Sequence, residues 1–286
     1  MVAAGGWRRE AGDLVRGVSG GLLFGVPLLY TMEVWWYGSW VDPRWMLGAL
    51  VLAFVAVLAL MRSAGFRDTR VTSWSDAVGD GVEILAVALV SAAAFLVLLR
   101  QVTWETSLEA AVGATVFEAI PFAFGAALAR QFLQRVDADD DGDPADDMPV
   151  DDPAIGRTLA DAGGAAVGAL VVSFSIAPTD EVPMIAQSLS APWLIAMVLA
   201  SLAASYAIVF AADFLDQEGR RRHEGLFQRP FAETVGAYAI ALVVALVALL
   251  AFERVGPDHS WESWVAFTLV LGLPAAIGGA AGRLAV

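Results

Sequence analysis

The sequence predicts an all-α integral membrane protein of about eight transmembrane helices, and three observations predict this fold class. Apolar residues make up 58% of the chain and charged residues only 17%. The charged residues cluster between long apolar runs, and about 20 apolar residues suffice for a helix to cross the ~30 Å hydrocarbon core. Most arginines fall in alternate connections between these runs, as expected for loops on one side of a membrane.

Eight apolar segments are long enough to serve as spans, and the arginines between them give the orientation. With the N-terminus in the cytoplasm, every arginine lies on the inner side except Arg44, Arg100 and Arg254. Because cytoplasmic loops are enriched in arginine, we expect a multi-pass protein of the cell membrane with both termini cytoplasmic. Tryptophans such as Trp40 and Trp104 fall near the expected outer interface, where aromatic side chains gather. The expected spans are roughly 15–37, 46–64, 78–100, 107–132, 157–178, 190–213, 232–252 and 263–285.

The two halves of the chain carry the same series of polar and helix-breaking residues in the same order, which indicates an internal repeat. Four spans per half give both halves the same orientation, so we expect two parallel four-helix repeats related by an axis along the membrane normal. A weaker match, between residues 103–106 and 260–263, needs a shift of four residues. We expect the first repeat over 1–135, a linker over 136–154 and the second repeat over 155–286. The matched pairs are Thr31 and Thr179, Glu33 and Glu181, Trp45 and Trp193, Pro121 and Pro274, Gly125 and Gly278, and Arg130 and Arg283.

The expected linker holds much of the acidic excess behind the net charge of −14. Its residues 137–142 begin like a calcium-binding loop, but Met148 stands where that loop needs a bidentate carboxylate. The density of charge and proline favours a solvated, disordered connector. Acidic excess without any lysine is also typical of proteins from halophilic organisms, which concerns habitat and not function.

Glu118 is the acidic residue expected deepest in the membrane. It lies near the middle of the fourth span, one turn before Pro121, which frees the backbone carbonyl of Phe117 from helical pairing. An ionised carboxylate at the bilayer centre costs at least about 2.5 kcal/mol, so Glu118 should face the protein interior or be protonated. Two interpretations stay open: a functional ion or proton relay, and a buried glutamate that only bonds a neighbour.

The duplicated glutamates Glu33 and Glu181 form a second candidate ion or proton site, together with Thr31, Thr179 and Asp180. If both glutamates face inward, the repeat brings two carboxylates together to share a proton or a cation. Pro178 and Pro183 flank the second copy and predict unwound backbone there. The alternative is that both glutamates are solvated at the outer interface. At the inner ends of the spans, Asp80, Glu83 and Glu233 are candidates for the inner mouth of a cation path.

Small residues recur at four-residue spacing on two spans, which lets helices approach one another closely. The first span carries Gly17, Gly21 and Gly25, and the fifth carries Ala160, Gly164 and Gly168. We expect these stripes to pack helices within the bundle, and they also offer a face for a homo-oligomer.

Enzyme and cofactor signals are weak. Cysteine and lysine are absent, which excludes disulfides, thiolate chemistry and a retinal Schiff base. No hydrolase, metalloprotease or nucleotide-binding motif occurs, so we expect neither an enzyme nor a cofactor, and the metal ligands stay unknown. The basic cluster at 220–222 is too small to predict nucleic-acid binding. The lipid bilayer is the expected partner, and a small cation (H⁺, Na⁺ or a divalent ion) is the expected substrate of a transporter or channel. The alternative is a non-transporting scaffold or a partner subunit of a larger complex.

The motif TMEVWW at 31–36, followed by Gly38, resembles an uncharacterised family of prokaryotic integral membrane proteins. The similarity covers most of the chain apart from the acidic linker. It implies the multi-span fold and no particular substrate.

Overall fold

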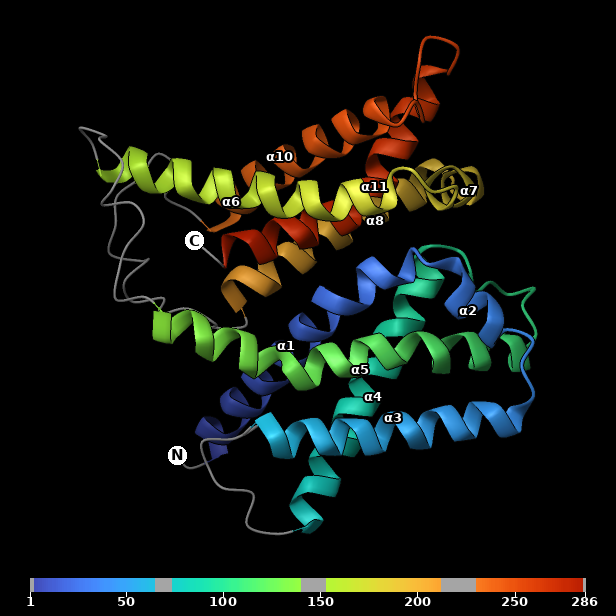
Figure 1. Ribbon diagram of the computed structural model, residues 1–286, viewed down its shortest axis with the longest axis vertical. Coiled ribbons are helices and arrows are strands. Elements are labelled where there is room, and N and C mark those ends of the chain that lie inside the picture. Colours follow the sequence, from blue (N-terminus) through green and yellow to red (C-terminus); the bar gives the residue numbers. More distant parts are fainter. Residues whose placement is uncertain (1–2, 65–73, 140–152, 212–229, 285–286) are drawn as a thin grey trace. The chain divides into compact units, whose positions relative to one another are not determined.

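The computed structural model describes residues 3–64, 74–139, 153–211 and 230–284 and contains no strand among them. The chain divides into two compact units, Met1–Gln134 and Arg135–Val286. Figure 1 shows the first unit in blue to green and the second in yellow-green to red.

The described residues of unit 1 form four long helices and one short helix. The short helix α2 follows α1 after a break at Tyr30 and Thr31. Pro27 and Pro121 lie inside α1 and α5, where the missing amide leaves a carbonyl without its helical donor, whereas Pro43 begins α3, where no helical carbonyl needs that amide. In chain order the helices are α1 (Ala3–Leu29), α2 (Met32–Gly38), α3 (Pro43–Ala64), α4 (Trp74–Leu98) and α5 (Leu108–Asp139).

Unit 2 has the same order of elements: a long helix, a short helix after a break, and three further long segments. The short helix α7 bends away from α6 by 90° (Figure 1). A π-helical segment, η2, continues α8. The elements are α6 (Pro153–Ile176), α7 (Glu181–Ser188), α8 (Ala191–Tyr206), η2 (Ala207–Ala211), α10 (Pro230–Ala251) and α11 (Trp261–Arg283).

The described helices confirm a multi-span membrane fold. Seven are long and apolar enough to cross a membrane, and the bent pair α6–α7 gives an eighth if it counts as one span. Their outer faces carry apolar side chains that water would not favour: Leu52 and Val90 are each 70% exposed. Such faces are what lipid contact requires.

The expected first span was too long. The sequence predicted one helix over 15–37, but α1 ends at Leu29 and residues 32–38 form the separate helix α2. At the break the amide of Thr31 bonds the carbonyl of Leu28 at 2.8 Å, and the indole of Trp35 bonds the carbonyl of Leu29 at 3.2 Å. In unit 2 the amide of Thr179 bonds the carbonyl of Ile176 at 3.0 Å.

Small residues bring the first and last helices of each unit into backbone contact. In unit 1, a Cβ added at Gly20 would lie 2.7 Å from the Gly125 carbonyl oxygen of α5. In unit 2, a Cβ added at Gly278 would lie 2.5 Å from the Gly168 carbonyl oxygen of α6. The prediction for Gly17 was wrong, because a Cβ there would meet nothing within 4 Å. Gly20 takes its place in the contact, while Gly21, Gly25, Gly164 and Gly168 pack as expected.

The ends of the helices repeat the same hydrogen bonds in both units. Arg100 after α4 and Glu253 after α10 both adopt the left-handed conformation, with φ of 57° and 56°. Ser107 caps α5 by accepting from the Ala110 amide at 3.2 Å, and Ser260 caps α11 by accepting from the Ser263 amide at 3.2 Å. The two left-handed residues have the same spacing along the chain as the two capping serines. The weaker match that needed a four-residue shift is therefore not the register that the helix ends follow.

The expected linker lies largely outside the described residues. Helix α5 continues to Asp139 and α6 begins at Pro153, so both enter the segment 136–154 from its ends. Residues 140–152, which include most of the acidic run and Met148, are not described. The basic cluster at 220–222 also lies outside the described residues.

Candidate functional site

The carboxyl group of Glu118 is buried at the middle of a membrane span. The apolar stretch of α5 runs over Leu108–Ala129, and at ~1.5 Å per residue Glu118 lies about 15 Å from either end. Its side chain has no exposed surface, and neither carboxylate oxygen has a hydrogen-bond partner among the described residues. A buried polar group without a partner is rare in folded proteins and requires an explanation.

Glu118 shares the face of α5 that packs on α1 and α2. Residues three and four apart lie on one helix face, which places Glu118 in line with Phe122 and Ala114. The ring of Phe122 fills the space beside Gly25 of α1. A Cβ added to Gly38, the last residue of α2, would lie 3.0 Å from the Cα of Ala114. Glu118 therefore lies between two close contacts with the α1–α2 segment.

Glu33 and Thr31 belong to the break that this segment contains. Both side chains are exposed, Thr31 as the residue before α2 and Glu33 in its first turn. Trp36 and Trp40 lie nearby along the chain, are 54% and 60% exposed, and stack edge to face with ring centres 6.1 Å apart.

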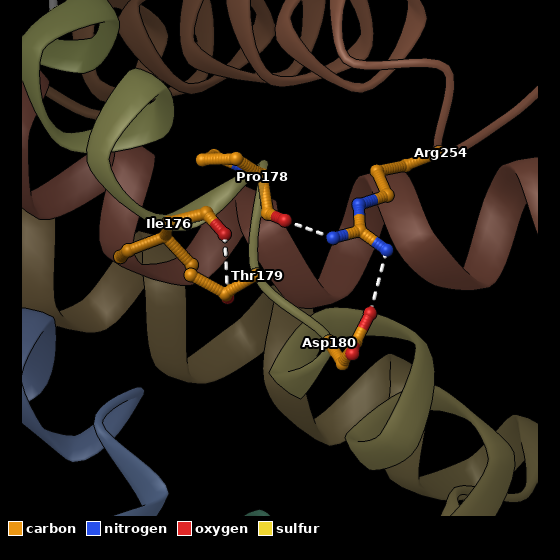
Figure 2. A network of polar contacts seen from close by, with 5 residues as sticks. All are labelled: Ile176, Pro178, Thr179, Asp180 and Arg254. Carbon is orange, nitrogen blue, oxygen red and sulfur yellow. Dashed lines mark hydrogen bonds and ion pairs between the residues drawn. The ribbon is translucent and has the colours of Figure 1, made fainter.

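In unit 2, a network of polar contacts binds the backbone and side chains at the break between α6 and α7 (Figure 2). The guanidinium of Arg254 donates to the backbone carbonyl of Pro178 and pairs with the carboxylate of Asp180 at 2.6 Å. The hydroxyl of Thr179 donates to the Ile176 carbonyl at 2.7 Å, in the last turn of α6. Glu181, the first residue of α7, is half-buried.

The inner-mouth candidates fall into two settings. In unit 1, Asp80 and Glu83 of α4 line a cavity of about 80 Å³, together with the paired side chains of Asp13 and Arg16 on α1. In unit 2, Glu233 of α10 forms an ion pair with Arg283 of α11. Arg283 is only 1% exposed, and its guanidinium lies 5.6 Å from the centre of the Phe210 ring.

Sequence reasoning grouped some of these residues and missed others. It placed Asp80 and Glu83 together, and it noted the break at 178–181. It did not pair Arg254 with Asp180, because the two are 74 positions apart and Arg254 stood out only as one of three outer arginines. Glu33 belongs to unit 1 and Glu181 to unit 2. Within the described ranges, no three His, Asp or Glu side chains gather as a metal site would require.

Comparison with known proteins identifies a family. No curated protein and no solved structure is detectably similar to the chain. A family model does match, over residues 13–286, and so includes both units and every candidate residue described above. The chain belongs to the family described as "Putative integral membrane protein (DUF2391)".

Proposed function

We propose that this protein is a transporter or channel for a small cation in the cell membrane, and not an enzyme. The observation that carries the proposal is the buried, unpartnered carboxyl group of Glu118 at the middle of α5. An ionisable side chain within a span is costly to the fold, and such residues mark ion and proton pathways. A purely structural role would give this carboxyl group a hydrogen-bond partner, and none is present among the described residues.

The proposal includes an internal repeat, in which unit 1 and unit 2 are copies of one four-span element. Three pairs of local features support it. The turns after α1 and α6 share one hydrogen bond, from Thr31 to Leu28 and from Thr179 to Ile176. The left-handed residues after α4 and α10 and the serines that cap α5 and α11 follow in the same order, and these two pairs have equal spacing along the chain. Parallel repeats of this kind are a common plan among transporters.

The outer and inner ends of the path are proposed from the positions of the other carboxylates. Glu33 and Glu181 follow the breaks at one end of their units, where tryptophans such as Trp40 are exposed. Asp80 and Glu83 line the cavity between α1, α4 and α5 in unit 1. With both termini cytoplasmic, as the arginines predict, the first group faces outward and the cavity faces inward.

Ion flux into proteoliposomes tests the proposal. The wild type is reconstituted beside Glu118→Gln and a matched control, Glu109→Gln, which makes the same change at an exposed position of the same helix. We expect H⁺ or Na⁺ flux in the wild type and in the control, and flux at the level of empty liposomes for Glu118→Gln. A folded Glu118→Gln variant with full flux would remove Glu118 from the pathway.

The duplicated pair is tested separately. A Glu33→Gln, Glu181→Gln double variant with unchanged flux would exclude these residues as ion ligands. Wild-type protein that passes none of the cations tried would overturn transport and leave the scaffold or partner-subunit function as the alternative.

A further inference from the structure

We propose that Glu118 and the broken helix α1–α2 form a binding site for one monovalent cation, a proton or Na⁺, and that unit 2 has no copy of it. This inference rests on the proposed function and deepens it, because it fixes the number, charge and location of the sites. All the residues of the site belong to unit 1.

The position of Glu118 along the helix axis, relative to the α1–α2 break, follows from the contacts that α5 makes on either side of Glu118. Along α5, Phe122 lies against Gly25 and the backbone at Gly113 lies against Gly38. The sequence of contacts shows that the two segments run antiparallel. Glu118 lies about midway between Phe122 and Gly113. The α1–α2 residues between Gly25 and Gly38 include the break at 30–31. The carboxyl group of Glu118 is therefore level with the break.

Backbone near Glu118 can supply further oxygen ligands. Pro121 has no amide hydrogen, so the Phe117 carbonyl lacks the donor that an α-helix would give it. Across from it, the chain leaves helical pairing between Leu29 and Met32. Unwound backbone at membrane depth persists where it lines a cavity or is buried in protein, and its carbonyls coordinate Na⁺ or accept from a protonated carboxyl in many transporters.

The charge of the site limits what it can hold. A single carboxylate balances one positive charge, and Phe122, one turn further along α5, is fully buried and apolar, as are Val26 and Leu29 in the last turns of α1. A divalent ion would retain an uncompensated charge away from water, which is strongly unfavourable. Among the described residues no three Asp, Glu or His side chains gather in one place, as a site for a divalent metal ion would require. The occupant is accordingly a proton or one Na⁺ ion.

Unit 2 lacks the carboxylate of this site. In the register that relates the left-handed residues and the capping serines of the two units, the counterpart of Glu118 is Leu271. Leu271 is fully buried, so an apolar side chain occupies the place of the acid. A leucine at this position supplies no negative charge to balance a cation.

The break in unit 2 also holds a cation of its own. The guanidinium of Arg254 binds the Pro178 carbonyl and Asp180 between α6 and α7 (Figure 2). In the same register Gln101 stands at the position of this arginine in unit 1, and its amide donates to the Leu99 carbonyl of its own loop at 3.0 Å. The break in unit 2 is thus bound by a positively charged side chain, whereas the side chain at the same position in unit 1 is uncharged.

Labelling with dicyclohexylcarbodiimide tests the site independently of flux, because this apolar reagent modifies protonated carboxyl groups within membranes. The full-length protein in liposomes is labelled with and without NaCl at several pH values, with choline chloride at equal ionic strength as the control. Peptide mass spectrometry then locates the product. We expect one label per chain, on Glu118, which is lost in Glu118→Gln and retained in Glu109→Gln.

The two cations give different results. If Na⁺ occupies the site, labelling slows by about tenfold at a Na⁺ concentration ten times the Kd. If only a proton binds, labelling falls as the pH rises and is the same in NaCl and choline chloride. Labelling that spares Glu118, or that modifies Glu33 and Glu181 at equal rates, would overturn the site. If a cation protects Glu118 from labelling but the protein carries no flux, the binding site stands and transport is refuted. If the protein carries flux but Glu118 is not labelled, transport stands and the binding site is refuted.

Discussion

Replacement of Gly168 by alanine should destabilise unit 2, whereas the same replacement at Gly163 on the same helix should stabilise it. A Cβ at Gly168 would lie 2.8 Å from the Gly278 carbonyl carbon and 3.0 Å from the Gly282 Cα, so backbone atoms would have to move. Overpacking of this kind costs about 1–3 kcal/mol. A Cβ at Gly163 would meet nothing within 4 Å, so only the gain in helix propensity remains, about 0.5–1 kcal/mol.

Thermal unfolding in detergent, followed by circular dichroism, measures both effects. At about 2–4 °C per kcal/mol for a protein of this size, a cost of about 1–3 kcal/mol means that Gly168→Ala should lower the Tm by about 2–12 °C. Gly163→Ala should raise the Tm by about 1–4 °C. In unit 1 we expect the same contrast between Gly20→Ala, which meets the Gly125 carbonyl oxygen, and Gly17→Ala, which meets nothing. Shifts of equal sign for Gly168→Ala and Gly163→Ala would refute the argument that backbone contact, and not helix propensity, requires glycine at 168.

Two further substitutions concern buried charge and backbone strain. Glu233→Gln removes the carboxylate that pairs with the buried guanidinium of Arg283 and should lower the Tm, at a cost of up to about 3–5 kcal/mol. Asp13→Asn breaks an exposed pair and should cost less than about 1 kcal/mol, so equal shifts would contradict the burial argument. Glu253→Gly removes the steric strain of a non-glycine residue in the left-handed conformation and should stabilise the protein by about 1 kcal/mol, and Arg100→Gly should do the same in unit 1. A loss of stability in both variants would contradict the argument from backbone strain.

The membrane fold could be predicted from the sequence because span length is set by the thickness of the bilayer. Apolar runs of the required length were visible without any tertiary information, and the structure confirms helices at all of them. The central depth of Glu118 was predictable for the same reason, since it follows from counting residues along one continuous helix. The family resemblance was also available from the sequence and is confirmed over residues 13–286.

Contacts between distant residues could not be predicted in the same way. Residues 15–37 contain only two charged side chains, Arg16 and Glu33, so the sequence predicts one span there, whereas α1 ends at Leu29, two residues after Pro27. The break is accompanied by the Trp35 indole bond and by the close approach of Gly38 to Gly113 on α5. A helix turns by about 100° per residue, so whether Gly17 or Gly20 faces a partner depends on where that partner lies.

The sequence by itself determined which regions hold helices long and apolar enough to cross a membrane, that matching polar residues recur in both halves, and which carboxylate lies nearest the middle of a span, because these depend on local composition and on spacing along the chain. Only the tertiary structure decided that Glu118 is fully buried with no hydrogen-bond partner in the described part of the chain, that it is level with the α1–α2 break, and that Arg254 binds across the break in unit 2. These depend on pairs of groups far apart in sequence, and their meeting is set by helix packing.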